Sequence, residues 1–582
     1  MHNQITLTSK NYFLATVALI LMSTGCNTVG RANKTQTSMV QEPISDSTIL
    51  QADFSQTENQ IGTVFDFFDV SVRTHKGSPN STPATFGRRA KVNTVRMLGG
   101  WSDKNLEADT YKWDGEKYVY DFEQATKRID SWLAKDWDIF QIVLDNPPWA
   151  FQHGFTFVDT PNGVNYLKKD QVGVYGNPLP PNDANAWQQY IHAFMQHLVA
   201  TYGEEKVLQW RFRVGSEIDT RPQHWAATRQ AFFDHYQNTV TAVHAVLPDA
   251  QIGVHFREAS FTSKYIDYTG NTEDSYATHF VSWAKKYNVP YDFFAVSYYP
   301  HITKKHELDM QRVYQHDMAP ITEHPDFNAN ASFEIHEFKF IIKMKRAGFE
   351  SVATSHASAF FAMLSKLMLE KNIQNVFQWG TAKNGSYIPE AMTQLALHPM
   401  VGNQLYANQV IRKPQIAGNL IDGIFTKHPD KDLYQVLTFN FNKDNLDYQQ
   451  AEQTQIKVVL DKPAGTKYRY RVANIDSSNN IDQMFANDFP KANILQSQGG
   501  WRKAGVHQTA SLNSALNEQG KKVYNANKGK YGKSNKLLWS DWLKGNTIAS
   551  ETLLNDTIQS SINIDSKLAS FAVQSYEIQL IE

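Results

Sequence analysis

The sequence predicts an α/β protein in which a (β/α)8 TIM barrel is followed by a C-terminal β-sandwich domain. Three observations support this fold class. The chain has 582 residues, which is too long for one simple hydrophobic core. Between about residues 60 and 400, short apolar runs alternate with longer helical patterns, as they do in parallel α/β folds. After residue 405, short β-type runs are separated by Asp, Asn, Pro and Gly, a texture typical of a sandwich.

Eight apolar runs are the strand candidates of the barrel. They lie at 64–72, 94–98, 139–144, 208–214, 251–256, 293–299, 332–338 and 375–379. Helical patterns, with apolar residues at spacings of 3, 4 and 7, lie between several of them, at 186–202, 228–246 and 356–369. An open doubly wound sheet is the alternative. No Gly-rich phosphate turn follows the first strand, and this favours the barrel.

The expected division of the chain follows from these patterns. It comprises a signal peptide at 1–25, a tether at 26–58, the barrel at 59–404 and the sandwich at 405–582. The sandwich strands are expected at 433–441, 455–460, 467–472 and 570–581, and the tether can add a strand at 48–54. The polar stretch 495–550 is expected to form loops over a short helix.

The N-terminus resembles an export signal. Lys10 precedes an apolar run at 12–22, which is too short to span a bilayer and has the length of a signal-peptide core. Ser23-Thr24-Gly25-Cys26 resembles a lipobox, with Ser23 where Leu is usual. We expect Cys26 to be lipidated, in an outer-membrane lipoprotein or a periplasmic protein of a Gram-negative bacterium; an ordinary cleaved signal is the alternative. With one cysteine in the sequence, no intrachain disulfide can form.

The charge and composition limit the classes of molecule that the protein is expected to bind. The 57 basic and 58 acidic residues leave a net charge of −1, so no long-range field favours nucleic acid or an anionic membrane. We expect a poly- or oligosaccharide partner, and membrane contact only through the lipid on Cys26. No cofactor or metal is expected, because His301 and His306 do not share a helix face and no His-Glu-x-x-His motif occurs. GKYGKS (529–534) resembles a phosphate loop but has Asn527 in place of its first glycine.

Two glutamates stand at the expected C-terminal ends of strands, where barrel enzymes carry their reactive groups. Glu217 lies in WRFRVGSEID (210–219) after the fourth strand, and Glu337 lies in FEIHEF (333–338) at the end of the seventh. Cleavage of a glycosidic bond with retention needs two carboxylates about 5–5.5 Å apart. Glu334 is the alternative to Glu337. Strand alternation puts these two on opposite faces, so only one can point into the barrel mouth.

Several segments resemble glycoside hydrolase family 39, the β-xylosidase and α-L-iduronidase family. The strongest is PPNDANAWQQYIHAFMQHLVATYGEEKVLQWRFRVGSEID (180–219) with HWAATRQAFFDHYQNTVTAVHAVLPDAQIG (224–253); DFFAVSYYP (292–300), IHEF (335–338) and YRYRVANIDSSNN (468–480) add to it. The resemblance implies that Glu217 is the general acid/base and Glu337 the nucleophile. It also implies that Tyr299 hydrogen-bonds the nucleophile and that Arg96 lies under the active site.

The sequence departs from the family at the positions that should touch the sugar. Ser216 stands where the family has Asn, and Leu98 and Ser297 stand where it usually has His. Arg213 replaces an acidic residue and needs an acidic partner if it is buried. We therefore expect the same mechanism on a different sugar, with a galactan or a modified algal galactan of the carrageenan or agar type preferred. A glycosidase for bacterial exopolysaccharide and an exported, non-catalytic carbohydrate-binding lipoprotein are the alternatives.

Four further residues are candidates for substrate binding, because they fall at or just beyond strand ends. Trp149 and Trp379 can stack on a sugar ring through their aromatic faces. His255 and His301 can donate hydrogen bonds to a sugar, although histidines at such places more often hydrogen-bond within a loop than serve in a site.

Overall fold

The computed structural model describes most of the chain beyond residue 46. The described residues are 47–71, 92–96, 111–134, 137, 139–144, 147–152, 177–221, 224–260, 276–302, 304–341, 355–379, 382–383, 386–387, 389–412, 414–477, 522, 526, 552–553 and 561–581. The expected signal run, Cys26, Leu98, the GKYGKS stretch and nearly all of 495–550 lie outside them. Within the described part, none of the helices combines the length and the apolar character needed to cross a membrane.

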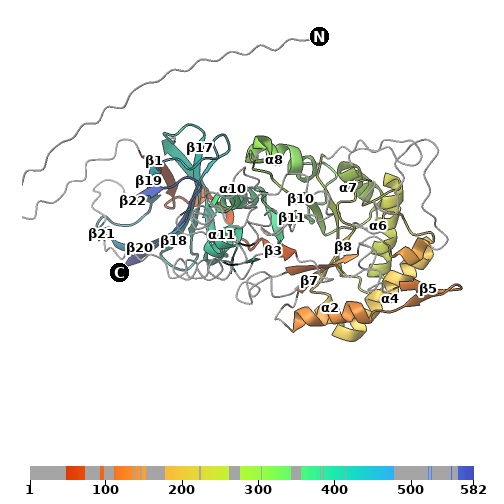
Figure 1. Ribbon diagram of the computed structural model, residues 1–582. Coiled ribbons are helices and arrows are strands. Elements are labelled where there is room, and N and C mark those ends of the chain that lie inside the picture. The colour runs from red at the N-terminus through yellow and green to blue at the C-terminus, as the bar shows by residue number, and fades with distance from the viewer. Residues whose placement is uncertain are drawn as a thin grey trace, which may run out of the picture. The chain divides into compact units, whose positions relative to one another are not determined.

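Eight parallel strands pair in a closed ring (Figure 1). In ring order they are β3 (Phe68–Ser71), β4 (Val92–Arg96), β7 (Ile139–Leu144), β8 (Arg211–Val214), β9 (Gln251–Phe256), β10 (Phe293–Tyr298), β11 (Ser332–Phe338) and β12 (Ile373–Trp379). Each lies in or overlaps one of the eight expected strand runs. Because all of the pairings are parallel, the C-terminal ends of the strands meet at one edge. The arrangement is an α/β barrel-like domain.

Helices separate most of these strands along the chain. They are α2 (Glu123–Leu133), α4 (Ala184–Tyr202), α5 (Glu204–Val207), α6 (Arg229–His244), α7 (Tyr276–Tyr287), α8 (Met310–Val313), the π-helical turn η7 (Tyr314–Met318), α9 (Ala319–Thr322), α10 (Ser355–Lys371) and α11 (Pro389–Leu397). The 3-10 turns are η1 (Thr57–Asn59), η5 (Trp149–Gln152), η6 (Lys305–Glu307) and η8 (His398–Met400). The connection from β3 to β4 lies outside the described residues.

Helix α4 shows how the sequence sets these elements. Its carboxylate N-cap, Asp183, accepts hydrogen bonds from the N–H groups of Asn185 and Ala186, which satisfies donors that the first turn leaves open. Gly203 ends the helix with φ 86°, a conformation that costs glycine little. Trp187 is fully buried on the expected apolar face, and its indole N–H donates to the hydroxyl of Thr239 in α6 at 2.9 Å.

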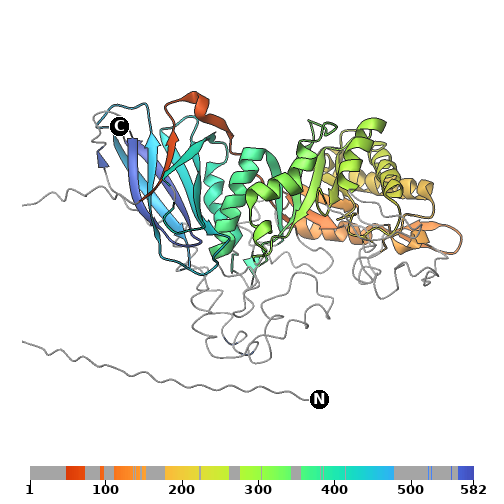
Figure 2. The same ribbon diagram turned by 90° about the horizontal axis from the view of Figure 1, so that it is seen from above.

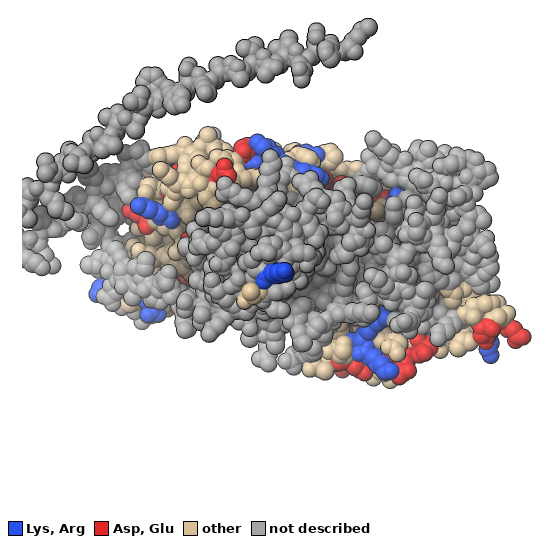
Figure 3. Space-filling model, viewed as in Figure 1, with Lys and Arg blue, Asp and Glu red and all other residues tan. Residues whose placement is uncertain are grey.

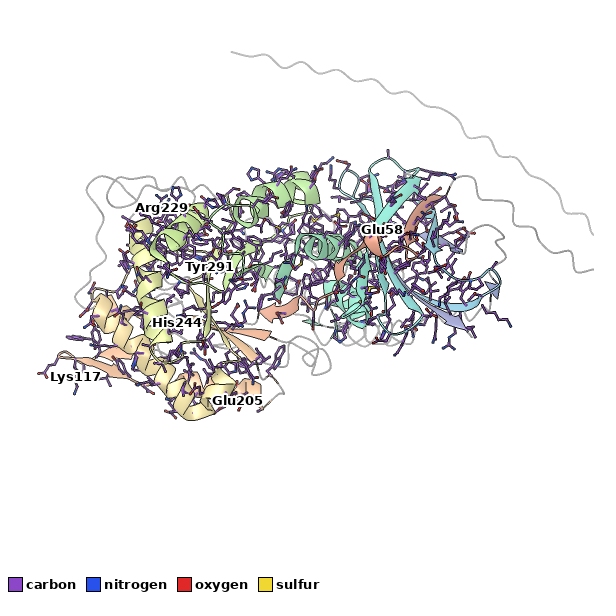
Figure 4. The ribbon with its side chains drawn as sticks, turned by 180° about the vertical axis from the view of Figure 1, so that it is seen from behind. Glu58, Lys117, Glu205, Arg229, His244 and Tyr291 are labelled. Atoms are coloured by element: carbon purple, nitrogen blue, oxygen red, sulfur yellow. The ribbon has the colours of Figure 1, made fainter. Side chains whose placement is uncertain are left out.

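Two further antiparallel pairs belong to the loops of this domain. They are β5 (Tyr111–Trp113) with β6 (Tyr118–Tyr120), and β13 (Ala382–Lys383) with β14 (Ser386–Tyr387). Figure 4 shows Lys117 at the tip of the β5–β6 hairpin. Acidic and basic residues are interspersed over this hairpin and α2 (Figure 3), where Lys127 pairs with Glu123. This mixing agrees with the near-zero net charge.

The C-terminal part contains two sheets around a shared core. One sheet has the order β2-β15-β17-β18-β23-β20-β21 and the other β16-β1-β19-β22. The strands are β1 (Thr48–Asp53), β2 (Gln60–Thr63), β15 (Gln404–Tyr406), β16 (Asn408–Arg412), β17 (Asn419–Lys427), β18 (Leu433–Asn442), β19 (Glu452–Val459), β20 (Lys467–Ile475), β21 (Thr552–Leu553), β22 (Ser561–Leu568) and β23 (Val573–Ile581). One apolar cluster joins side chains of both sheets, including Leu50, Ile456, Phe425 and Tyr576.

The N-terminal strands join these C-terminal sheets. β1 pairs with β16 on one side and with β19 on the other. β2 pairs with β15, although it falls in the range expected for the barrel. The expected strand 64–72 is shortened for the same reason, since the N–H of Val64 donates to the carbonyl of Asn403 at 2.8 Å and only Phe68–Ser71 pairs in the ring.

Helix α10 packs against both parts (Figure 2). Fourteen of its residues are buried, which explains why its sequence is apolar all round. The ring of Phe360 lies 5.6 Å from that of Phe441 in β18, and Lys366 pairs with Asp422 of β17 at 2.9 Å. On the barrel side, Phe361 contacts Phe68 of β3 with ring centroids 5.7 Å apart. The apolar core is therefore continuous from the barrel into the C-terminal sheets.

Candidate active site

Glu217 lies in a tight turn that begins where β8 ends. Gly215 has φ 72°, and its N–H donates to the carbonyl of Leu144 at 3.1 Å. Glu217 itself has φ 48°, a left-handed conformation that is uncommon for a residue with a side chain. Strained backbone conformations of this kind are common at functional sites, where contacts with the surrounding structure maintain them. The turn thus fixes the direction of the Glu217 side chain, which is only 12% exposed.

Substitution of Gly215 by alanine is expected to disturb this turn. The added methyl group would lie 2.5 Å from Cδ1 of Ile218, and a left-handed conformation costs a residue with a Cβ about 1–2 kcal/mol. We expect Gly215→Ala to lose about 100-fold in kcat/KM, because a small displacement of a catalytic group is costly. The free energy of unfolding, measured in urea, should fall by about 1–2 kcal/mol.

Gly402→Ala is the matched control for this substitution. Gly402 also has a positive φ, 87°, but nothing lies within 4 Å of a Cβ added there. The control should therefore lose only the stability that the positive φ costs, without the clash, and should keep its activity. Wild-type kcat/KM in Gly215→Ala would show that the turn does not position Glu217.

Glu337 is placed by a β-bulge near the end of β11. Val296 of β10 pairs with Ile335, but the next residue, Ser297, pairs with Glu337, so His336 is left out of the ladder. A bulge adds one residue on one strand and re-aims the side chains beside it. The Glu337 side chain is directed by this irregularity.

The expectation that Glu334 and Glu337 face opposite sides of the sheet is wrong. Glu334 pairs with Arg211 of β8, and Glu337 contacts Arg213 of the same strand. Strands β8 and β11 are not neighbours in the ring, so both carboxylates reach across the barrel interior. The bulge breaks the alternation. Glu334 and Glu337 instead lie at different levels along the barrel axis, and Glu337 is the one at the C-terminal edge of the strands.

The Glu337 carboxylate is surrounded by donors and a cation. The Tyr299 hydroxyl donates to Oε2 at 2.6 Å, and the Ser216 hydroxyl donates to Oε1 at 3.4 Å. Arg213, which is fully buried, places a guanidinium nitrogen 3.9 Å from Oε1 and 3.4 Å from the Ser216 hydroxyl. Glu337 is thus the acidic partner that Arg213 needs. These surroundings suit a carboxylate in its charged form.

Contacts run from Glu337 to Glu217 through two residues. Tyr299, bonded to Glu337, lies under the guanidinium of Arg257, whose carbon is 5.3 Å from the ring centroid. Arg257 in turn places Nε 3.8 Å from Oε1 of Glu217. Burial, followed by the charges of Glu337 and Glu217, raises the pKa of Tyr299 well above its ordinary value. The phenol therefore stays neutral and donates its hydrogen bond. The structure brings Glu217, Ser216, Tyr299 and Glu337 together.

Arg257 is a site residue that the sequence reading missed. It is the residue that follows β9, whose last residue is Phe256. A charged residue directly after an expected barrel strand was the available signal. At the end of this strand the sequence pattern pointed to His255 instead.

The remaining predicted residues lie around this group or outside the described side chains. His255 is buried, and its Nε2 lies 3.0 Å from the Ser297 hydroxyl. The His301 N–H donates to Glu307 at 2.8 Å, which holds a loop. Arg96 is the last residue of β4 and Trp379 the last of β12, so their backbones lie at strand ends, whereas Trp149 is the first residue of η5, beyond the end of β7; the structure does not describe the side chains of these three residues.

Glu334 belongs to a separate buried network near the start of β11. Its carboxylate oxygens accept hydrogen bonds from Arg211 at 2.7 Å, from the side chain of Asn375 at 3.0 Å and from Ser332 at 2.5 Å. The His336 Nε2 lies 2.6 Å away. Burial works to raise the pKa of Glu334, but the charge of Arg211 and the contact with His336 hold it well below its ordinary value. The alternative nucleophile is therefore an internally paired residue.

A cavity of about 680 Å³ opens beside this network, at the N-terminal edge of the strands. Its lining includes Arg211, Gln251, Phe293, Glu334 and Asn375, which stand at or near the starts of their strands. It therefore lies at the opposite end of the ring from Glu217 and Glu337. Among the described residues, no cluster of three or more His, Cys, Asp or Glu side chains is arranged to hold a metal ion.

Comparison with known proteins identifies the family. A model of glycosyl hydrolases family 39 matches residues 164–416. The α-1,4-L-rhamnosidase of Formosa agariphila is 34% identical over 438 residues, which cover 74% of this chain and 85% of the relative. The chain belongs to glycosyl hydrolase family 39. This family 39 protein is also 33% identical to the β-xylosidase of Geobacillus stearothermophilus over 143 residues, which cover 24% of this chain and 25% of the relative.

Solved structures agree on the fold of the family 39 chain. The GH39 enzyme from Xanthomonas axonopodis pv. citri matches with a TM-score of 0.56 and 15% identity, covering 92% of this chain and 98% of the other. At that identity the likeness concerns the fold. With the family and its curated relatives, the function class is settled, and the protein is a glycosidase.

Proposed function

We propose that this glycosidase acts by double displacement with retention, with Glu217 as general acid/base and Glu337 as nucleophile. The observation that carries the proposal is the set of contacts on Glu337. The hydroxyls of Tyr299 and Ser216 and the guanidinium of Arg213 surround its carboxylate, as a nucleophile that must stay ionised requires. Among the described residues, Oε1 of Glu217 is buried and has no hydrogen-bond partner, and the guanidinium of Arg257 lies 3.8 Å from it.

The steps follow from these positions. Glu217 gives its proton to the glycosidic oxygen while a carboxylate oxygen of Glu337 attacks the anomeric carbon, and the bond to the leaving group breaks. The glycosyl-enzyme is then hydrolysed by a water that Glu217 deprotonates, which returns Glu217 to its protonated form. Tyr299 keeps one oxygen of Glu337 oriented throughout, because its hydroxyl stays protonated.

An α-1,4-linked L-rhamnoside is the substrate that we favour. The Formosa agariphila relative carries that activity in its name and covers most of the chain. L-Rhamnose lacks the 6-hydroxyl, and Ser216 and Ser297 are shorter than the side chains usual in the family. Both hydroxyls are engaged within the protein, by Glu337 and His255 respectively. A galactan of the carrageenan or agar type is the second candidate, because the same replacements suit other sugars with fewer or differently oriented hydroxyls.

The test is hydrolysis of a matched panel. It contains α-L-rhamnosides, β-D-galactosides and β-D-xylosides with the same aryl leaving group, and oligosaccharides with α-1,4-linked rhamnose or galactan backbones. We expect rhamnose release, seen by mass spectrometry, with the α anomer formed first in proton NMR. An initial β anomer would contradict double displacement. Galactan products alone would favour the second candidate, and glycan binding without product would favour a non-catalytic carbohydrate-binding protein.

We infer a full (β/α)8 barrel from β3 to α11 and a C-terminal β-sandwich that includes β1 and β2. Export through the run at 12–22 and a lipid on Cys26 would place the enzyme in the outer membrane facing polysaccharide. Metabolic labelling with a fatty acid tests this placement, since Cys26→Ala should lose the label and become soluble in the periplasm.

A further inference from the structure

The cavity at the N-terminal edge of the barrel has the size and the position of a ligand site. Its volume of about 680 Å³ falls within the roughly 300–1,000 Å³ of small-molecule sites. Residues from the starts of five neighbouring strands, β8 to β12, line it, together with the loop before β11 and the turn between α10 and β12. The cavity is therefore built largely on strand ends, which hold side chains more precisely than loops do.

Neutral hydrogen-bonding groups are the commonest feature of this lining. Five of its side chains are amides, which belong to Gln251, Asn330, Asn372, Gln374 and Asn375. An amide offers donors on its nitrogen and an acceptor on its oxygen, and a sugar hydroxyl can likewise donate and accept. Within the part of the chain that the structure describes, the exposed side chains of Gln251 and Asn330 make no hydrogen bond to the protein. These two amides are open to a ligand.

The charges around the cavity cancel. Arg211 pairs with Glu334 at 2.7 Å, and the other two charged residues of the described lining, Asp292 and Lys371, have opposite signs. The lining thus gives no net attraction to an anion or a cation. Because removal of an unpaired charge from water is costly, the cavity favours an uncharged ligand that is rich in hydroxyl groups.

An aromatic ring at the rim adds a surface for the apolar face of a sugar. Of the three phenylalanines in the lining, Phe293 and Phe333 are buried, whereas Phe327 is partly exposed. The ring of Phe327 packs against that of Tyr291 (Figure 4), with centroids 6.1 Å apart. Aromatic faces contact the C–H groups of sugars through dispersion. Phe327 is the lining ring that a ligand can reach.

The two carboxylates of this cavity are already engaged by the protein. Glu334 is held by Arg211, and Asp292 accepts a hydrogen bond from the backbone N–H of Ile252 at 2.7 Å. The two proposed catalytic glutamates lie at the opposite end of the ring. A sugar in this cavity would therefore be bound and not hydrolysed.

We propose that this cavity is a second, non-catalytic carbohydrate site that binds a neutral saccharide. The amides form hydrogen bonds with its hydroxyl groups, Phe327 packs against a face of its ring, and the balanced charges disfavour uronic acids. A site of this kind holds a polysaccharide on the enzyme while the active site acts at the other edge, which raises the local concentration of the chain. The inference does not depend on the roles proposed for Glu217 and Glu337.

Amide hydrogen exchange of the full chain, followed by mass spectrometry, tests where a sugar binds. The probes are L-rhamnose, D-galactose and D-xylose, which contain no glycosidic bond to hydrolyse. We expect these sugars to slow exchange in peptides that cover 327–332 and 371–375, separately from any change in peptides that cover 215–219 at the active site. D-Galacturonate differs from D-galactose by one carboxylate and should bind about tenfold more weakly or worse.

Three substitutions assign the protection to the cavity. Ala329→Trp fills the cavity from its exposed rim and should abolish the protection of 371–375. Gln251→Ala removes one amide and should weaken binding by about threefold to tenfold. Ala200→Trp is the matched control, because it places the same side chain on the exposed face of α4, and it should bind sugar as the wild type does. Thermal melts show that each variant is folded.

Two results would overturn the inference of a second site. One is an absence of protection at the cavity with all three sugars in the wild-type chain, and the other is protection that persists in Ala329→Trp. Galacturonate that binds as tightly as galactose would overturn the preference for a neutral ligand. A wild-type enzyme that hydrolyses none of the panel would instead remove the proposed function and leave the exchange result unaffected, so the two failures are distinguishable.

Discussion

Replacement of Glu337 and Glu217 by alanine is expected to give two different defects. Glu337→Ala should lower kcat by about 10⁴-fold or more, because no covalent intermediate can form. Glu217→Ala should lose less on an aryl glycoside whose leaving group needs no proton, since attack by Glu337 remains possible. Both variants keep the apolar core intact, but Glu337→Ala also takes this carboxylate away from the buried Arg213, so it should be less stable than Glu217→Ala, and a thermal melt must show that it is folded at the assay temperature.

Azide distinguishes the two roles by stereochemistry. In Glu217→Ala, azide should attack the glycosyl-enzyme and give a glycosyl azide with retained configuration. In Glu337→Ala, azide fills the space of the lost carboxylate and should attack the substrate directly, which gives the inverted azide. NMR spectra of the products distinguish the retained from the inverted glycosyl azide. The opposite assignment of products would exchange the two roles, and full activity in either variant would end the two-glutamate mechanism. Glu205→Gln is the matched control and should behave as wild type.

Loss of one partner from the buried Arg211–Glu334 pair is expected to have the largest effect on stability. Arg211→Met leaves the Glu334 carboxylate uncompensated in the barrel interior. Removing one partner of a buried pair costs about 3–5 kcal/mol. The free energy of unfolding in urea should fall by about that amount. Arg211→Met combined with Glu334→Leu removes both charges and should recover most of the loss.

The same pair predicts the effect of acid. The folded-state pKa of Glu334 is held below its ordinary value, so the contribution of Glu334 to stability is complete above a pH of about 4.3 and is lost as the pH falls further toward the folded-state value. Glu334→Gln should remove this part of the acid dependence. A variant with the wild-type slope below pH 4 would show that another group causes it.

Much of the ring was predictable because its strands are short apolar runs at regular intervals. Runs such as 251–256 and 332–338 coincide with β9 and β11. The run 208–214 yields a strand only from Arg211, because the N–H of Trp210 donates to the carbonyl of Val207 at 3.0 Å and the chain is still turning there. The pattern of apolar residues indicates which residues are buried, but it does not indicate where a turn ends and a strand begins.

The arrangement of residues around Glu217 and Glu337 was harder to predict from the sequence. The resemblance pointed to Glu217, Glu337 and Tyr299, and these residues do lie together. The bulge at His336 was not predictable, because the residues around it have no glycine or proline to mark an irregularity. Arg257 was not predictable, because a single arginine after a strand has no spacing partner in the sequence. Its side chain contacts Glu217, which follows β8, and Tyr299, which follows β10.

The threading of β1 has a consequence for biosynthesis. This segment is made before every other described strand, yet its two hydrogen-bonding neighbours, β16 and β19, are made more than 350 residues later. Contacts so distant along the chain close slowly. The C-terminal sheets thus cannot be completed until translation is nearly over, and the nascent chain must carry an unpaired edge for that whole time. Transport in an unfolded state followed by folding at the destination would avoid this exposure, and removal of residues 47–63 would leave a gap in the finished sheet that no other segment of the described chain fills.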